Sequence, residues 1–135
     1  MPVLGLDVGE KRIGVALAEG SIAVPLTVIQ RVEEAVDLRR VISLAQDHNA
    51  DIIVIGLPRS MDGSIGHQAE SVLGFASALG HITDIPVDTY DERLSTVEAE
   101  RLMRDAGAKR GRRKEKVDAM AAAVILQGYI DRMNT

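Results

Sequence analysis

Residues 3–18 read as two apolar strands joined by a short polar turn, with one acidic residue inside the first strand. Apolar side chains occupy most of positions 3–8 and 13–18, and positions 9–12 form the turn, which predicts a β-hairpin. Asp7 is the exception, because a carboxylate is costly to bury without a partner charge. We therefore expect a hairpin at the start of the chain and a cation beside Asp7.

Three glycines surround Asp7 in this hairpin. Gly5, Gly9 and Gly14 have no side chain, and glycine inside a strand often marks a close approach of backbone or ligand. In a purely structural interpretation, Asp7 accepts hydrogen bonds from the turn amides or pairs with a basic turn residue. Aspartate is rarely buried without a partner, so we favour a functional site. Such a hairpin can hold a divalent metal, as in RNase H-like nucleases, or phosphate, as in the sugar kinase and actin ATPases.

The length of 135 residues suits one domain over residues 1–135, large enough to bury a core. The ATPase fold resembles two RNase H-like domains that close over a nucleotide, and a chain of this length fits only one. Cysteines, an apolar run near 18 residues and a charged-then-apolar leader are all missing from the sequence. Disulfides, a membrane span and a secretory signal therefore lack support, and we expect a cytoplasmic protein.

The charge is distributed unevenly along the chain. The net charge is −4, but residues 101–116 hold eight Lys or Arg against two acids, a local balance of +6, so the rest carries −10. A basic segment on an acidic body is typical of a phosphate-binding surface, although a solvated helix end and loop would also account for it. Aromatic residues number only three, so base stacking is not expected.

The remaining elements alternate between strands and helices. Residues 22–29 predict a third strand, with Pro25 at an edge or bulge, and 51–57 predict a buried parallel strand beside the first. Further segments with helix or strand patterns are 32–49, 66–79, 85–91, 95–107 and 115–133. This order predicts an α/β fold with a five-stranded mixed sheet, in which a three-strand antiparallel meander joins two parallel strands and helices cover both faces.

Polar residues follow the two parallel strands. Arg59 and Ser60 come after one strand, where ligands collect in α/β sheets, although surface loops commonly carry such residues. Asp91 and Glu92 end the other strand and precede Arg93. Neighbouring side chains in a strand point to opposite faces, so we expect one of the two acids to face the site.

A second candidate acid lies in the final helix. Asp118 shares a face with Ala121, Ala122 and Ile125 by helical spacing, which points its carboxylate at the core. The alternative is that Asp118 merely complements the N-terminal dipole of the helix. We favour a functional role because the carboxylate lies on the apolar face.

Four ordered motifs complete the pattern. LDVGEKRIGVA (6–16), GLPRSMDG (56–63), YDERLST (90–96) and KVDAMAAAVIL (116–126) resemble those of the YqgF/RuvX family, over nearly the whole chain. This family is known as Holliday junction resolvases or pre-16S ribosomal RNA nucleases, and its fold is RNase H-like.

The resemblance implies a metal-dependent endonuclease in which Asp7, Glu92 and Asp118 are catalytic and hold Mg²⁺ or Mn²⁺. Related resolvases carry a glutamate at the end of the fourth strand, whereas here that position has no acid and the YDERLST motif supplies Glu92, with Asp91 beside it. Carboxylates on separate elements suit such hard ions. The expected substrate-binding residues are Arg12, Arg59, Ser60, Arg93, Lys109, Arg110, Arg112, Arg113 and Lys114.

Three functions remain open at this point. The first is cleavage of structured RNA, with 5′-end processing of precursor 16S ribosomal RNA as the expected case. The second is resolution of four-way DNA junctions, which normally requires a homodimer. The third is a non-catalytic module that binds nucleic acid or a ribosomal precursor. A basic loop attracts either polymer, so the sequence does not separate RNA from DNA, nor a monomer from a homodimer.

Overall fold

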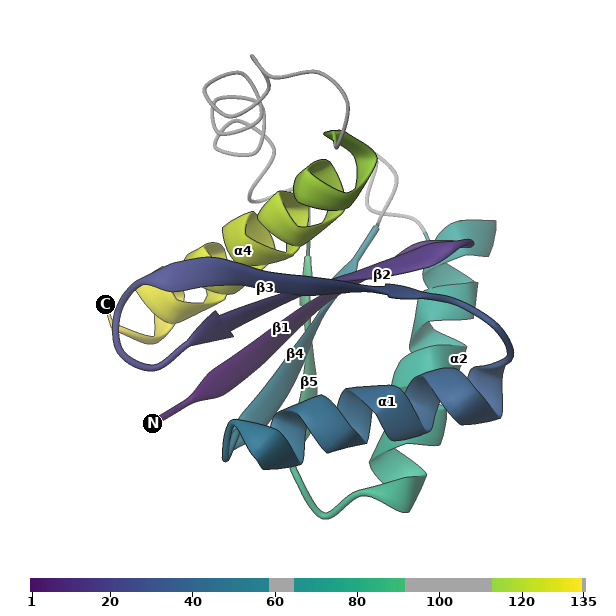
Figure 1. The fold of residues 1–135 in the computed structure, drawn as a ribbon, viewed down its shortest axis with the longest axis horizontal. Helices are drawn as coiled ribbons and strands as arrows, with labels where there is room; N and C mark the ends of the chain where they lie inside the picture. Colours follow the sequence, from purple (N-terminus) through teal and green to yellow (C-terminus); the bar gives the residue numbers. More distant parts are fainter. Residues whose placement is uncertain (59–64, 92–112, 135) are drawn as a thin grey trace.

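The computed structural model describes residues 1–58, 65–91 and 113–134 (Figure 1). Its strands are β1 (Val3–Val8), β2 (Arg12–Ala18), β3 (Ala23–Gln30), β4 (Ile52–Leu57) and β5 (Val87–Asp91). Its helices are α1 (Glu34–Asp47), α2 (His67–Ile82) and α4 (Arg113–Met133). The helix predicted over 95–107 lies outside the described residues.

The five strands form one mixed sheet in the order β3-β2-β1-β4-β5. β1 and β2 pair antiparallel, as do β2 and β3, whereas β4 runs parallel to both β1 and β5. The predicted meander and parallel strands are therefore confirmed. Pro25 lies on the edge strand β3, where the pairing with β2 shifts register between Val15 and Ala16. A proline at such a position removes no hydrogen bond that a central strand needs.

Alternation along each strand sorts the side chains onto two faces. One face carries Leu4, Leu6 and Val8 of β1 and packs in the core cluster of α1 and α2. The other face carries Val3 and packs against α4, in a cluster that includes Leu126. In Figure 1 the sheet separates α4 on one side from α1 and α2 on the other. The prediction of helices on both faces is confirmed.

The observed helices differ slightly from the predicted ranges. α1 lies within 32–49 as expected, and α2 continues three residues past Leu79 to Ile82. α4 begins at Arg113, two residues before the predicted start. Differences of this size are usual at helix ends, but this one places Asp118 beyond the first turn. None of the described helices is long and apolar enough to cross a membrane.

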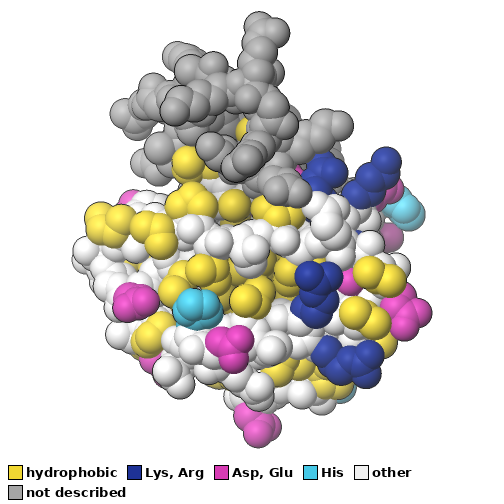
Figure 2. Space-filling view, viewed as in Figure 1, with side chains coloured by type: hydrophobic (Ala, Val, Ile, Leu, Met, Phe, Trp, Pro, Cys, Tyr) yellow, Lys and Arg dark blue, Asp and Glu magenta, His cyan; other side chains and the backbone are white. Residues whose placement is uncertain are grey.

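Charged side chains of both signs share the molecular surface. On the face drawn in Figure 2, Lys and Arg side chains lie toward the beginning of α1, with Asp and Glu side chains beside them. No single-sign surface forms among the described residues of this face. Most of the basic segment 101–116 lies outside the described residues, so the predicted basic surface stays a prediction.

Candidate functional site

Asp7 and Asp118 are brought to the same face of the sheet by one glycine. Asp7 lies directly opposite Gly14 in the β1–β2 ladder, and directly opposite residues of an antiparallel pair point to the same face. A Cβ atom at Gly14 would lie 1.9 Å from the backbone oxygen of Asp118. The backbone of α4 thus rests on Gly14, beside the position from which Asp7 projects.

The sequence of α4 permits this close contact. Ala122, Ala123 and Leu126 of α4 are buried against the sheet. A Cβ atom at Gly5, which lies on the same sheet face as Asp7, would lie 2.8 Å from the Cβ of Leu126. Small residues on both surfaces therefore let the helix approach the sheet along β1 and β2. The expectation that glycines mark a close approach of backbone is confirmed at Gly14, whereas at Gly5 the neighbour is the Leu126 side chain.

Asp118 forms an ion pair with Arg12, the first residue of β2. Arg12 Nε donates to Asp118 Oδ2 at 2.5 Å, and the two side chains are 28% and 26% exposed. Arg12 shares the face of Gly14, two residues further along the strand. The expected role of Arg12 as a phosphate contact stays a prediction, but in this structure its guanidinium contacts a candidate metal ligand.

Helix position argues against a dipole role for Asp118. The carboxylate belongs to the sixth residue of a helix that begins at Arg113, whereas the dipole effect falls off within the first turn. The side chain is also only partly exposed and pairs with Arg12. The dipole alternative is therefore not supported, and the functional role of Asp118 stays a prediction.

Strand alternation also separates the two acids at the end of β5. Tyr90 packs in the cluster under α4, whereas Val87 packs against the cluster of α1 and α2. Asp91 shares the parity of Val87, and its ladder partner Leu57 belongs to that same cluster. Asp91 is therefore assigned to the face opposite Asp7 and Asp118. Glu92, the other candidate, lies outside the described residues.

The other predicted site residues are described only in part. Arg59, Ser60, Arg93, Lys109, Arg110 and Arg112 lie outside the described residues. Arg113 and Lys114 belong to the first turn of α4 by their backbone. Within the described ranges no group of three His, Cys, Asp or Glu residues could hold a metal ion. A complete three-acid site therefore requires Glu92 or another residue beyond them.

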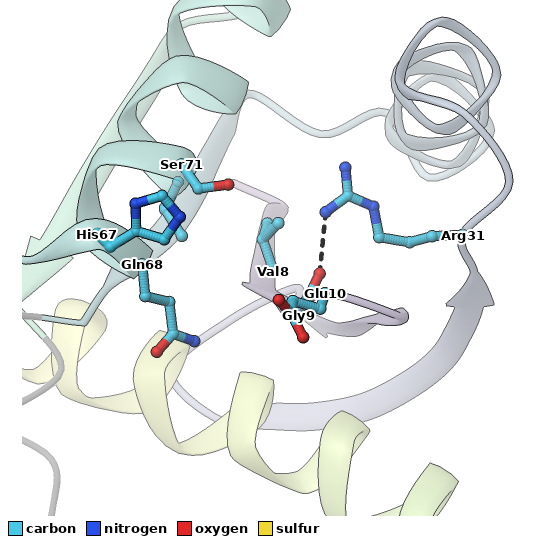
Figure 3. Close-up of a pocket in the computed structure, with 8 residues that line it drawn as sticks. Val8, Gly9, Glu10, Arg31, His67, Gln68 and Ser71 are labelled. Atoms are coloured by element: carbon cyan, nitrogen blue, oxygen red, sulfur yellow. Dashed lines mark hydrogen bonds between the residues drawn. The ribbon is translucent and has the colours of Figure 1, made fainter.

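A pocket of about 330 Å³ lies at the end of β1, on the sheet face that α1 and α2 cover (Figure 3). Its walls come from the hairpin turn, from Arg31 and from the first two turns of α2. Figure 3 shows His67, Gln68 and Ser71 on one side of this space and Arg31 on the other. His67, the first residue of α2, lines this pocket.

Arg31 makes three side-chain contacts in the wall of this pocket. Its Nε donates to Asp37 Oδ2 at 3.0 Å, its Nη1 donates to the Gly9 oxygen at 2.9 Å, and its guanidinium lies 5.3 Å from the Phe75 ring centre. Sequence reasoning missed this arrangement, because Arg31 reads as an exposed residue after a strand. Asp37, which is 1% exposed, gave a signal in its helical spacing to the buried Val41.

The chain is similar in sequence to known proteins over nearly its whole length. A protein from Desulforamulus reducens named "Putative pre-16S rRNA nuclease" is 45% identical over 133 residues, which cover 97% of each chain. A protein of the same name from Clostridium acetobutylicum is 44% identical over 133 residues, covering 97% of this chain and 98% of that one.

Two solved structures share the fold at low sequence identity. The structure "T. thermophilus RuvC in complex with Holliday junction substrate" aligns with a TM-score of 0.67 and 18% identity, covering 100% of this chain and 97% of that one. The Fowlpox virus resolvase in complex with Holliday junction DNA aligns with a TM-score of 0.58 and 11% identity, with 100% of both chains covered. The family model "RuvX: Holliday junction resolvase" matches residues 1–132. The chain therefore belongs to the RuvX family, as its four motifs indicated.

Proposed function

We propose that this protein is a metal-dependent endonuclease that hydrolyses phosphodiester bonds in structured nucleic acid, and that its substrate is the 5′ end of precursor 16S ribosomal RNA. The observation that carries the proposal is the contact of the Asp118 backbone in α4 with Gly14, the residue directly opposite Asp7 in the sheet. Membership in a resolvase family and relatives named as pre-16S rRNA nucleases support the reaction class.

The donor set fits a divalent cation. Asp7 and Asp118 belong to separate elements, β1 and α4, and the missing side chain of Gly14 lets the two elements approach. Carboxylate oxygens are the ligands that Mg²⁺ and Mn²⁺ prefer, and these ions keep several waters. When bound, such ions activate a water molecule and stabilise the leaving oxygen of the phosphodiester.

The residues of the chain divide into two roles in this proposal. Asp7, Asp118 and Glu92 hold the cation, with Glu92 preferred over Asp91 because Asp91 has the parity of the opposite face. The basic residues contact the phosphates of the substrate and orient the scissile bond. They are Arg12, Arg59, Ser60 with its hydroxyl, Arg93, Lys109, Arg110, Arg112, Arg113 and Lys114. Because precursor ribosomal RNA is made in the bacterial cytoplasm, the proposal places the protein there.

Resolution of four-way DNA junctions is the second candidate function. It is favoured by the family description and by solved structures of similar fold that contain Holliday junction substrates. A resolvase cuts two strands that are related by symmetry, so this function calls for a homodimer, whereas a monomer suffices for processing one RNA end. The substrate and the oligomeric state therefore test the two candidates together.

The test is a cleavage assay with purified protein and two end-labelled substrates, a precursor 16S 5′-leader RNA and a four-way DNA junction. Each is incubated with Mg²⁺ or Mn²⁺ and with the wild type, Asp7→Asn or Asp84→Asn. Asp84 is the matched control, because its side chain is exposed and it precedes β5. It therefore lies at the end of the sheet where the parallel strands begin, whereas Asp7 lies near the end of β1. Circular dichroism confirms that each variant is folded.

Three outcomes separate the possible functions. Cleavage of the RNA at one position by the wild type and Asp84→Asn, but not by Asp7→Asn, supports the processing nuclease. Symmetric cleavage of the junction with the same dependence on Asp7 supports the resolvase. Cleavage that Asp7→Asn leaves undiminished overturns the metal-site assignment, and binding without cleavage of either substrate favours the non-catalytic module.

A further inference from the structure

We propose that Arg12 is a positioning residue shared between Asp118 and the substrate: it holds the Asp118 carboxylate until a divalent cation binds, and is then released toward the phosphate. This inference rests on the proposed function, because it assumes that Asp118 is a metal ligand. It adds a defined order of events, in which metal binding precedes the phosphate contact of Arg12.

Arg12 and a divalent cation compete for one oxygen of Asp118. Arg12 Nε contacts Asp118 Oδ2 at 2.5 Å, so a cation that takes this oxygen as a ligand competes with the guanidinium for it. Arg12 and Gly14 lie on the same face of β2, and Gly14 lies directly opposite Asp7. The displaced guanidinium thus starts from the sheet face that carries Asp7 and packs against α4, so it is positioned to contact a phosphate bound on that face.

The ion pair between Arg12 and Asp118 is weak enough for a divalent cation to replace the guanidinium. Both side chains are about one quarter exposed, 28% for Arg12 and 26% for Asp118, and partly exposed ion pairs contribute little net free energy. A divalent ion carries twice the charge of a guanidinium and prefers carboxylate oxygen. Exchange therefore favours the metal, whereas a fully buried pair would resist it.

The geometry of the Arg12 guanidinium suits a contact with phosphate. Within the described part of the chain, the hydrogen bond to Asp118 is donated by Nε. The Nη1 and Nη2 groups form the other end of the planar fork, which matches the oxygens of a phosphate group in a bidentate contact. Arg12 is therefore suited to a phosphate in a way that the neighbouring Lys11, a point charge on an exposed side chain, is not.

The experiment compares Mn²⁺ affinity by calorimetry for the wild type, Arg12→Gln and Lys11→Gln. Lys11→Gln is the matched control, because it removes the same charge from the adjacent turn position without breaking the contact with Asp118. We expect Arg12→Gln to bind Mn²⁺ about fivefold more tightly than Lys11→Gln, since an ion pair of this exposure competes by roughly that factor. We also expect Arg12→Gln to bind substrate RNA more weakly than Lys11→Gln in the presence of Mn²⁺.

A second measurement follows the guanidinium itself. The ¹⁵N–¹H signal of Arg12 Nε, assigned by its loss in Arg12→Gln, should shift when diamagnetic Mg²⁺ is added to the wild type. The same signal should not respond to Mg²⁺ in Asp118→Asn, in which a metal ligand has been removed. This readout needs no cleavage. Arg12→Lys, which keeps the positive charge but has no Nε–H of this kind, provides the same assignment where Arg12→Gln is unstable.

The results separate failure of the proposed role of Arg12 from failure of the proposed metal site. Equal Mn²⁺ affinity of Arg12→Gln and Lys11→Gln, or an Nε signal that Mg²⁺ does not shift, overturns the role of Arg12 and leaves the nuclease proposal standing. If the wild type does not bind Mn²⁺, or if Asp7→Asn and Asp118→Asn bind it as tightly as the wild type does, the metal site itself is wrong and both proposals fail. Tighter metal binding together with weaker RNA binding supports the exchange.

Discussion

Asp7 lies directly opposite Gly14 in the β1–β2 ladder, and a methyl group at Gly14 would overlap the backbone oxygen of Asp118 at 1.9 Å. The missing side chain of a third residue therefore lets the backbone of α4 reach the strand that pairs with Asp7. A functional site of this kind depends on packing between elements, because α4 presents its acid only when its backbone reaches the sheet.

Gly14→Ala should displace α4 from β2. The new Cβ meets backbone atoms rather than the end of a flexible side chain, so the helix must move. We expect the free energy of unfolding to fall by about 3 kcal/mol, as in severe overpacking of a core. Urea denaturation measures this change, and calorimetry should show weaker Mn²⁺ binding by the folded fraction.

Gly20→Ala is the control for this substitution. Gly20 follows β2, and a Cβ atom there meets no other atom within 4 Å. Its free energy of unfolding should stay within about 0.5 kcal/mol of the wild type. If Gly14→Ala is as stable as Gly20→Ala, then α4 does not rest on Gly14 as the structure shows.

Much of the fold could be predicted because its patterns are local. Alternating apolar residues over 3–18 predicted the hairpin, and the β-branched run over 51–57 predicted a parallel strand, which is β4. The helical spacing around Asp118 placed its carboxylate on the face that packs on the sheet, where Ala122 and Ile125 are buried. These features depend on residues close together in the sequence.

The contacts that define the site could not be predicted in the same way. Arg12 and Asp118 are 106 positions apart, and nothing in either segment indicates which acid the arginine binds. Arg31 and Gly9 are likewise brought together only by the fold. Sequence alternation limited the choice between Asp91 and Glu92 to one acid per face, and the sheet register was needed to decide which face Asp91 occupies.

The ion pair between Arg31 and Asp37 should contribute strongly to stability. Asp37 is 1% exposed, its Oδ2 accepts from Arg31 Nε, and its Oδ1 accepts from the Val32 backbone at 3.1 Å. Asp37→Ala leaves the partly buried guanidinium without its carboxylate, so we expect a loss of about 3 kcal/mol in the free energy of unfolding. Urea denaturation at neutral pH provides the measurement.

A neighbouring acid of the same helix serves as the comparison. Glu34 is exposed and begins α1, so Glu34→Ala should change the free energy of unfolding by only about 0.5 kcal/mol. Similar losses in Asp37→Ala and Glu34→Ala would mean that the buried pair adds nothing beyond the general effect of removing an acid from the first turn of α1.

Tyr129 should make the protein less stable at alkaline pH. Burial, together with the hydrogen bond and the negative charge of Asp88, raises the pKa of Tyr129 above its ordinary value of 10.0. The folded state therefore holds this proton more strongly than the unfolded state, and the resulting stabilisation is present below about pH 10 and is lost as the pH rises through the raised pKa.

Urea denaturation between about pH 8 and about pH 11 should show a steeper loss of stability for the wild type than for Tyr129→Phe. Asp88→Asn removes the charge but leaves the burial, which is the largest cause, so its loss should fall between the two. Equal slopes for the wild type and Tyr129→Phe would show that the phenol does not titrate differently in the folded state.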